Sequence, residues 1–263
     1  MIIPCGTGVK GTAPLSLRAS IRRFRYTNSM SETQQPSPED QVRHAISLSS
    51  FLLERREAMR SLFHGKLFDV VPGSTKKHGK EWRNVAEHCI AVGRALDTLG
   101  RMLGIPDADR ERIVQVGLVH DWDKRLRKDK TSFAPAEQEK ALAYAKGILA
   151  THDPDGRLYD ATEPQGLKRL EDGTADPLEH LVHLVDLSCM PEGLVPPEKR
   201  IADLRMRHAA IDYDAVHPDF WKRKEALALR EERTILELLR AAGRDVPEGK
   251  RLCDILNEEM AGK

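Results

Sequence analysis

Two histidines and two aspartates lie within or directly after apolar segments of this chain. They are His88, the adjacent pair His120 and Asp121, and Asp186, which stands between Val185 and Leu187. An ionised aspartate inside a helical core is disfavoured, because its desolvation costs several kcal/mol unless a cation or a full set of hydrogen bonds compensates. One divalent metal ion would satisfy all four side chains. We therefore predict that these four residues bind a metal.

Two imidazoles and two carboxylates form a mixed set of nitrogen and oxygen donors. Such a set suits Mn²⁺, Fe²⁺, Co²⁺, Ni²⁺ or Zn²⁺ better than Ca²⁺, and Mg²⁺ stays a candidate. A bound divalent ion can lower the pKa of its water from ~15.7 towards ~7, so a hydroxide nucleophile becomes available near neutral pH. Hydrolysis of a phosphate ester requires such a nucleophile. The donor set therefore suits metal-dependent hydrolysis, such as that of a phosphate ester.

The segments that must position these side chains are predicted to be helical. Apolar residues recur at a spacing of three to four, which indicates helices over residues 38–63, 82–103, about 107–119 and 135–150. Further helices are predicted at 177–189, 198–208 and 218–242. The segment 152–176 is rich in Asp, Gly and Pro and is expected to be irregular. Because no strand-like alternation is apparent, the predicted fold class is all-α.

The composition supports a helical domain with an unstructured start. Aromatic residues make up 5% and charged residues 32% of the 263 residues, a balance typical of helical proteins with solvated outer faces. Residues 1–38 are expected to form a disordered tail, and 39–263 a single helical domain with a C-terminal helical extension. The first 31 residues of this tail are acid-free and arginine-rich, and they are similar to an organelle transit peptide. Met30, followed by Ser31 and Glu32, would also serve as an ordinary start of translation.

Charge, cysteine spacing and hydropathy bear on partners and compartment. The first 31 residues contain five basic residues and no acidic ones, which leaves 37 basic and 41 acidic residues for the rest. Such a body is not expected to bind nucleic acid, which needs a concentrated basic surface. The four cysteines form no CxxC pair, and no apolar run approaches the ~20 residues that cross a bilayer. We expect a soluble cytoplasmic protein without membrane contact, and a homo-oligomer stays open.

The order of the four predicted ligands resembles a known motif. The segments 85–88, 119–124 and 185–186 read VAEH, VHDWDK and VD. This H…HD…D order is similar to that of the HD-domain superfamily of metal-dependent phosphohydrolases, over about residues 81–189. The resemblance implies an HD-domain helical bundle in which His88, His120, Asp121 and Asp186 converge on the metal. It further implies activity on a small phosphate ester or a nucleotide, as a phosphomonoesterase, nucleotidase or phosphodiesterase.

The same resemblance points to residues around the four ligands. Asp121 and Lys124 are the predicted catalytic residues, since a lysine after the HD pair can reach a substrate phosphate as a point charge. The basic run after Lys124 equally fits a solvated helix end. Asp123 could orient a water or cap the helix. Some relatives hold a second metal with extra histidines, so His152 and His183 could bind a second ion or support the first. Otherwise His180 and His183 are expected to be surface or packing residues.

Two alternatives keep the metal and change the function. One is a catalytically weak nucleotide-binding or regulatory HD module, which retention of all four ligands disfavours. The other is a mixed-valent di-iron oxygenase of the same superfamily, which needs more ligands than the sequence places. The substrate is not readable from the sequence, because no glycine-rich phosphate loop is present.

Overall fold

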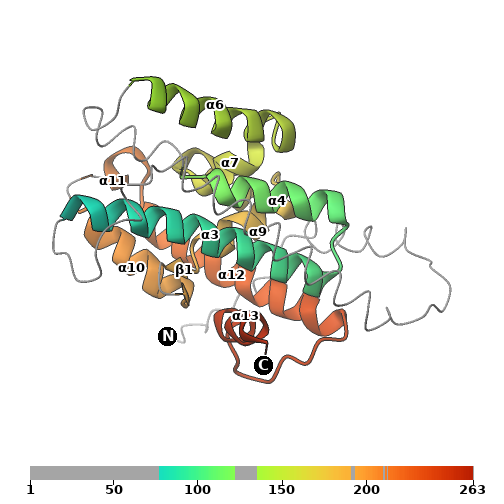
Figure 1. Ribbon diagram of the computed structural model, residues 1–263. Coiled ribbons are helices and arrows are strands. Elements are labelled where there is room, and N and C mark those ends of the chain that lie inside the picture. The colour runs from blue at the N-terminus through green and yellow to red at the C-terminus, as the bar shows by residue number, and fades with distance from the viewer. Residues whose placement is uncertain (1–76, 122–134, 191–192, 210, 212, 263) are drawn as a thin grey trace, which may run out of the picture.

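The computed structural model describes residues 77–121, 135–190, 193–209, 211 and 213–262. These residues form a mostly helical fold with one two-stranded sheet (Figure 1). The predicted tail at 1–38 and the predicted helix at 38–63 lie outside the described residues, as do Asp123 and Lys124. The predicted fold class is confirmed as mostly helical.

Two helices supply the first three predicted metal ligands. Helix α3 spans Lys77–Leu103 and so begins five residues before its predicted start. The chain turns at Gly104, which has a φ of 68°, and Pro106 precedes helix α4 at Asp107–Val119. Asp107 and Asp109 lie in the first turn of α4, where acidic side chains stabilise the positive end of the helix dipole.

The segment that begins at residue 135 is more regular than predicted. Helix α6 spans Pro135–His152 and is followed by α7 at Arg157–Thr162, a 3₁₀ turn at Pro164–Gly166 and α8 at Leu167–Asp172. The Asp153 carboxylate accepts hydrogen bonds from the backbone N–H groups of Leu158 and Tyr159, at 3.0 and 2.8 Å. This side chain thereby supplies acceptors for the first turn of α7. The irregular segment expected at 152–176 is therefore wrong in part.

A helix, a short two-stranded sheet and four further helices complete the described part of the chain. Helix α9 at Pro177–Asp186 ends three residues before its predicted end, and an antiparallel pair of two-residue strands follows, β1 at Cys189–Met190 and β2 at Gly193–Leu194. The last helices are α10 at Pro197–Arg207, α11 at Tyr213–Val216, α12 at Phe220–Ala241 and α13 at Leu252–Ala261. The strands and the helices α11 and α13 were not predicted.

The main core lies between α3, α4, α9 and α12. Leu96, Leu99, Ile113, Leu184 and Ile235 are fully or almost fully buried in one cluster that these four helices share. Helix α6 packs on the outer side of α4, and α13 packs against α3 at the opposite edge (Figure 1). Helices α4 and α9 both end inside this arrangement, so their last residues are delivered to the interior.

The start of α9 is held by a buried carboxylate. Glu179 is 0% exposed, and its side chain accepts hydrogen bonds from the guanidinium groups of Arg157 and Arg169. The same carboxylate accepts from the backbone N–H of Asp176, which caps the helix in return through Leu178 N–H. Helices α7 and α8, which carry these two arginines, are thereby tied to α9.

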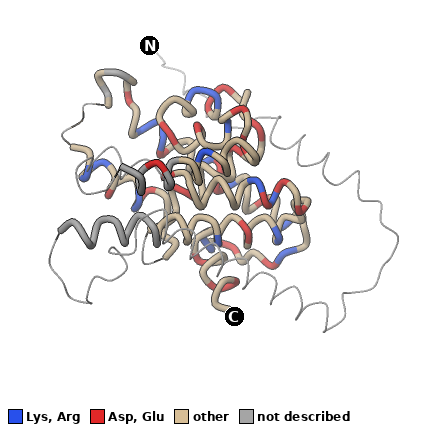
Figure 2. Tube along the Cα trace, turned by 45° about the horizontal axis from the view of Figure 1, so that its top comes forward, with Lys and Arg blue, Asp and Glu red and all other residues tan. Residues whose placement is uncertain are grey.

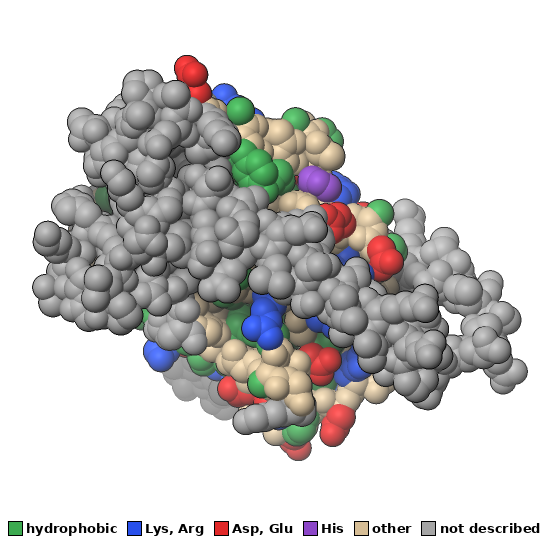
Figure 3. Space-filling model, viewed as in Figure 1, with side chains coloured by type: hydrophobic (Ala, Val, Ile, Leu, Met, Phe, Trp, Pro, Cys, Tyr) green, Lys and Arg blue, Asp and Glu red, His purple; other side chains and the backbone are tan. Residues whose placement is uncertain are grey.

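Charged side chains of both signs cover the described part of the molecule. Lys and Arg alternate with Asp and Glu along the helices (Figure 2), and the face in Figure 3 shows the same mixture among its described side chains. Several of them pair, as Arg251 does with Glu198 and Glu232. None of the helices in the described part of the chain combines the length and apolarity needed to cross a membrane.

Candidate metal centre

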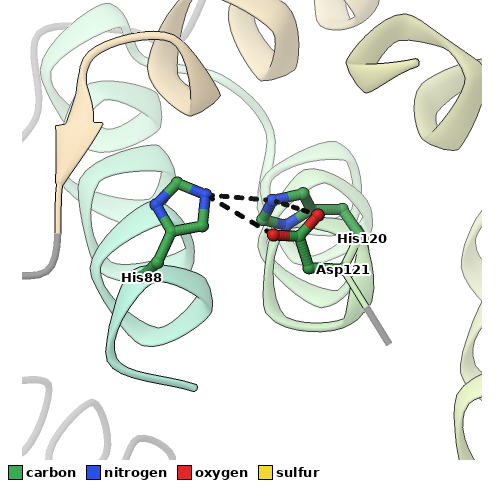
Figure 4. A group of neighbouring side chains, drawn as sticks. All are labelled: His88, His120 and Asp121. Atoms are coloured by element: carbon green, nitrogen blue, oxygen red, sulfur yellow. Dashed lines mark hydrogen bonds and ion pairs between the residues drawn. The ribbon is translucent and has the colours of Figure 1, made fainter. Parts of the chain in front are cut away.

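Three of the predicted ligands form a compact buried group between α3 and α4. His88 lies in α3, His120 is the C-cap residue of α4, and Asp121 follows it. Their exposed fractions are 3%, 1% and 3%. One donor atom from each lies within 4.8 Å of the others, so the group could hold a metal ion. In Figure 4 the three side chains point toward one another.

The nitrogen atoms that face each other are the Nε2 atoms of the two imidazoles. They are 3.2 Å apart. The Asp121 carboxylate places Oδ1 3.5 Å from His120 Nε2 and Oδ2 4.0 Å from His88 Nε2. The rings are 70° from parallel with centroids 5.1 Å apart, so their edges rather than their faces meet. The three side chains thus direct polar atoms at one small volume.

Asp186, the fourth predicted ligand, reaches the same volume from the end of α9. Its Oδ1 lies 2.9 Å from His88 Nε2 and 3.3 Å from His120 Nε2. The side chain is 14% exposed, against 4% or less for the other three. The structure therefore brings all four predicted residues together, and the side carrying Asp186 is the one nearest to solvent. That Asp186 coordinates the metal stays a prediction.

Two glycines allow α3 and α4 to approach closely beside this group. A Cβ atom on Gly117 would lie 2.7 Å from Leu96 Cδ1 of α3, and one on Gly93 would lie 2.8 Å from Leu118 Cδ2 of α4. Both distances are shorter than side chains tolerate, so a larger residue would force the facing leucine side chain to shift. The Gly117 carbonyl also accepts a hydrogen bond of 2.7 Å from His120 Nδ1. Gly117 therefore permits the close packing of α3 and α4 and also fixes the orientation of the His120 ring.

The hydrogen bond to Gly117 determines which His120 nitrogen faces the group. A carbonyl can only accept, so Nδ1 carries the proton and Nε2 points at Asp121, Asp186 and His88. A neutral His120 would present a lone pair to carboxylate oxygens, which is repulsive. Either a proton or a cation must therefore lie at Nε2. Because α4 and α9 both end here, the negative ends of their dipoles also favour a positive charge.

The same charges displace the pKa values of the group. Burial lowers the pKa of His88 below 6.5, and Asp186 offsets this only in part. Burial alone would also lower the pKa of His120, but the charge of Asp121, with smaller contributions from other neighbours, raises it well above 6.5. Burial would raise the pKa of Asp186, and the two imidazoles hold it well below its usual range. Near neutral pH His120 of the metal-free group therefore carries a proton on Nε2.

Metal binding is expected to release about one proton near neutral pH, because His120 must lose its Nε2 proton to become a ligand. Since the pKa of His120 is raised, affinity should increase with pH until the pH passes that pKa and then level off. Calorimetric titration of Co²⁺ in two buffers with different ionisation enthalpies measures the released proton. Equal apparent binding enthalpies in both buffers would show that His120 is not the protonated group.

The other predicted site residues are placed less directly. The half-buried His152 ends α6, where its backbone carbonyl accepts a bond from Arg112, and it is not part of the metal-binding group. His183 is buried and bonded to Glu231. Its binding of a second ion stays a prediction. Asp123 and Lys124 lie outside the described residues.

Sequence reasoning missed a buried acidic residue that contacts α9, the helix that ends at Asp186. Glu231 is 2% exposed and contacts both His180 and His183, so of the two expected places for these histidines the buried packing position is the one observed, and a surface position is not. A signal was available, because Glu231 falls on the apolar stripe of α12 between Ala228 and Ile235. A charged residue at such a position needs a buried partner.

The donor set fits a divalent transition ion, since imidazole nitrogens and a carboxylate converge where a positive charge is required. This conclusion depends on the arrangement of the side chains alone. Comparisons with protein-family models, with curated proteins and with solved structures find no match to this chain.

Proposed function

We propose that this protein is a metal-dependent phosphohydrolase that cleaves a phosphate ester, with a nucleotide as one candidate substrate. The observation that carries the proposal is the 3.2 Å approach of His88 Nε2 and His120 Nε2 beside the buried Asp121. Two imidazole nitrogens this close need a proton or a metal ion between them, and the neighbouring carboxylates of Asp121 and Asp186 favour a cation there. The H…HD…D order of the sequence supports the same function.

The described side chains have distinct tasks in this proposal. A bound divalent ion supplies Lewis acidity and acidifies a water molecule. His120 presents Nε2 because Gly117 holds its Nδ1, and His88 presents Nε2 from the facing helix. Asp121 supplies negative charge from a buried position. Asp186, the most exposed of the four, lies where solvent and a substrate phosphate would reach the group.

A metal and substrate panel tests this function. The protein is stripped with a chelator and reloaded with Mn²⁺, Fe²⁺, Co²⁺, Ni²⁺, Zn²⁺ or Mg²⁺, and turnover is measured on a phosphomonoester, a phosphodiester and several nucleotides. We expect turnover of at least one ester class that depends on the added metal. Metal binding without turnover on any substrate would favour the nucleotide-binding or regulatory module, which a nucleotide-dependent rise in melting temperature would then reveal.

A further inference from the structure

A second buried polar cluster connects α9 to α12. His180 and His183 of α9 both contact Glu231 of α12, with His180 Nδ1 2.6 Å from Oε1 and His183 Nδ1 2.7 Å from Oε2. The three side chains are 2%, 1% and 2% exposed. One carboxylate therefore accepts a hydrogen bond from each of two imidazoles on consecutive turns of the facing helix. We call these three residues the Glu231 cluster.

The proton positions in this cluster argue against a single metal ion bound by both histidines. An ionised carboxylate only accepts, so each Nδ1 carries a proton and donates it. The charges of the histidines hold the pKa of Glu231 below its usual value, although burial alone would raise it. Both Nε2 atoms are buried and have no hydrogen-bond partner among the described residues. Because Nδ1 and Nε2 face opposite sides of a ring, two rings that converge through Nδ1 turn their Nε2 atoms apart.

The cluster is better suited to fixing the rotation of α9. Two bonds on consecutive turns, His180 and His183 to one carboxylate, resist both rotation and sliding of the helix. Asp186 follows His183 by three residues, which places it about 60° away around the same helix. Side chains reach about 5–6 Å from a helix axis, so a rotation of about 20° would move the Asp186 carboxylate by about 2 Å. Such a shift exceeds the tolerance of its contacts with His88 and His120.

We propose that Glu231 is a positioning residue for the metal centre. With His180 and His183 it sets the rotation of α9, and it thereby holds Asp186 Oδ1 between His88 Nε2 and His120 Nε2. This inference rests on the proposed metal-dependent function. It adds the Glu231 cluster, which the H…HD…D motif does not include, to the residues that determine metal affinity.

Substitution of Glu231 tests the proposal with Co²⁺ as the probe. Glu231→Gln keeps the size of the side chain but can accept from only one histidine, so we expect Co²⁺ affinity to fall about 10- to 100-fold and the visible Co²⁺ spectrum to change. Glu232→Gln is the matched control. Glu232 is the next residue of α12, is 4% exposed, and bonds Arg251 rather than α9. It should lower the melting temperature without changing Co²⁺ affinity.

A pair of substitutions at His183 separates positioning from direct coordination, and it remains informative if Glu231→Gln does not fold. His183→Asn places an amide N–H near the position of Nδ1–H and should keep Co²⁺ affinity and spectrum close to those of the wild type. His183→Leu removes the bond to Glu231 and should weaken binding. If His183→Asn weakens binding as much as His183→Leu does, Nε2 matters and the positioning role is wrong.

The outcomes also separate this inference from the proposed function. If the wild type binds Co²⁺ and Glu231→Gln binds it equally well, the positioning role fails while the metal centre stands. An equal loss in Glu231→Gln and Glu232→Gln would attribute the effect to general destabilisation and overturn the inference. If the wild type itself binds no Co²⁺, the proposed function and this inference both fail.

Discussion

Asp121→Ala is expected to remove bound metal and, with it, all measurable phosphohydrolase activity. Asp121 is 3% exposed, and its charge makes the largest contribution that raises the pKa of His120. Its removal therefore deprives the group of a buried negative charge. A divalent ion held by fewer charges dissociates more readily and acidifies water less. Enzymes accelerate phosphate-monoester hydrolysis by up to ~10²¹-fold. Without the metal, turnover should therefore fall below detection.

Elemental analysis of the purified variant, together with turnover on the metal-loaded substrate panel, checks this expectation. Asp97→Ala is the matched control, because Asp97 is a 6% exposed aspartate of α3 that pairs with Arg110 of α4. It should lower the melting temperature yet retain metal and activity. Full metal content in Asp121→Ala would rule out Asp121 as a ligand. Proton release on Co²⁺ binding should also decrease in any residual binding by the variant, because the pKa of His120 falls.

The candidate site was predictable where one residue alone violated the apolar pattern of its helix. His88 and the pair His120 and Asp121 stand in or directly after apolar helical segments, and burial of such groups requires compensation whatever the tertiary structure. The same reasoning singled out Asp186. This reasoning did not require the positions of the four residues relative to one another, because one ion would satisfy them all. Only the structure shows the hydrogen bond from His120 to Gly117, which orients the ring.

Glu231 shows where this reasoning ends. The periodicity predicted a helix over 218–242, but nothing in one sequence tells which helix packs on its apolar face. His180 and His183 precede Glu231 by 51 and 48 residues, and their contacts depend on how α9 and α12 are packed. A buried charge could be predicted there, and its partners could not.

Element length explains most differences in the fold. Helices α3, α6 and α12 have 27, 18 and 22 residues, long enough for a repeat of 3.6 residues to be recognised. Helices α7 and α8 have six residues each and the strands have two, which is too short for either period. Their formation depends on contacts such as the Asp153 carboxylate with the start of α7.

Glu179→Ala is expected to cause a large loss of stability outside the metal centre. Glu179 is 0% exposed and binds Arg157, Arg169 and the backbone N–H of Asp176, so its removal takes one buried acceptor from each of the three. Breaking a buried ion pair by removing one partner costs about 3–5 kcal/mol. Because the side chains of Arg157 and Arg169 are 40% and 28% exposed and can be hydrated again, we expect the lower end of that range, about 3 kcal/mol.

Chemical denaturation with a fitted midpoint and slope measures this loss of unfolding free energy, and a melting temperature lower by roughly 6–12 °C should accompany it. Glu171→Ala is the control, since Glu171 forms a more exposed pair with Arg223, in which the side chains are 25% and 39% exposed. Removing that pair should cost less than about 1 kcal/mol. If the two variants lose equal stability, the buried carboxylate of Glu179 is not what holds the start of α9 to helices α7 and α8.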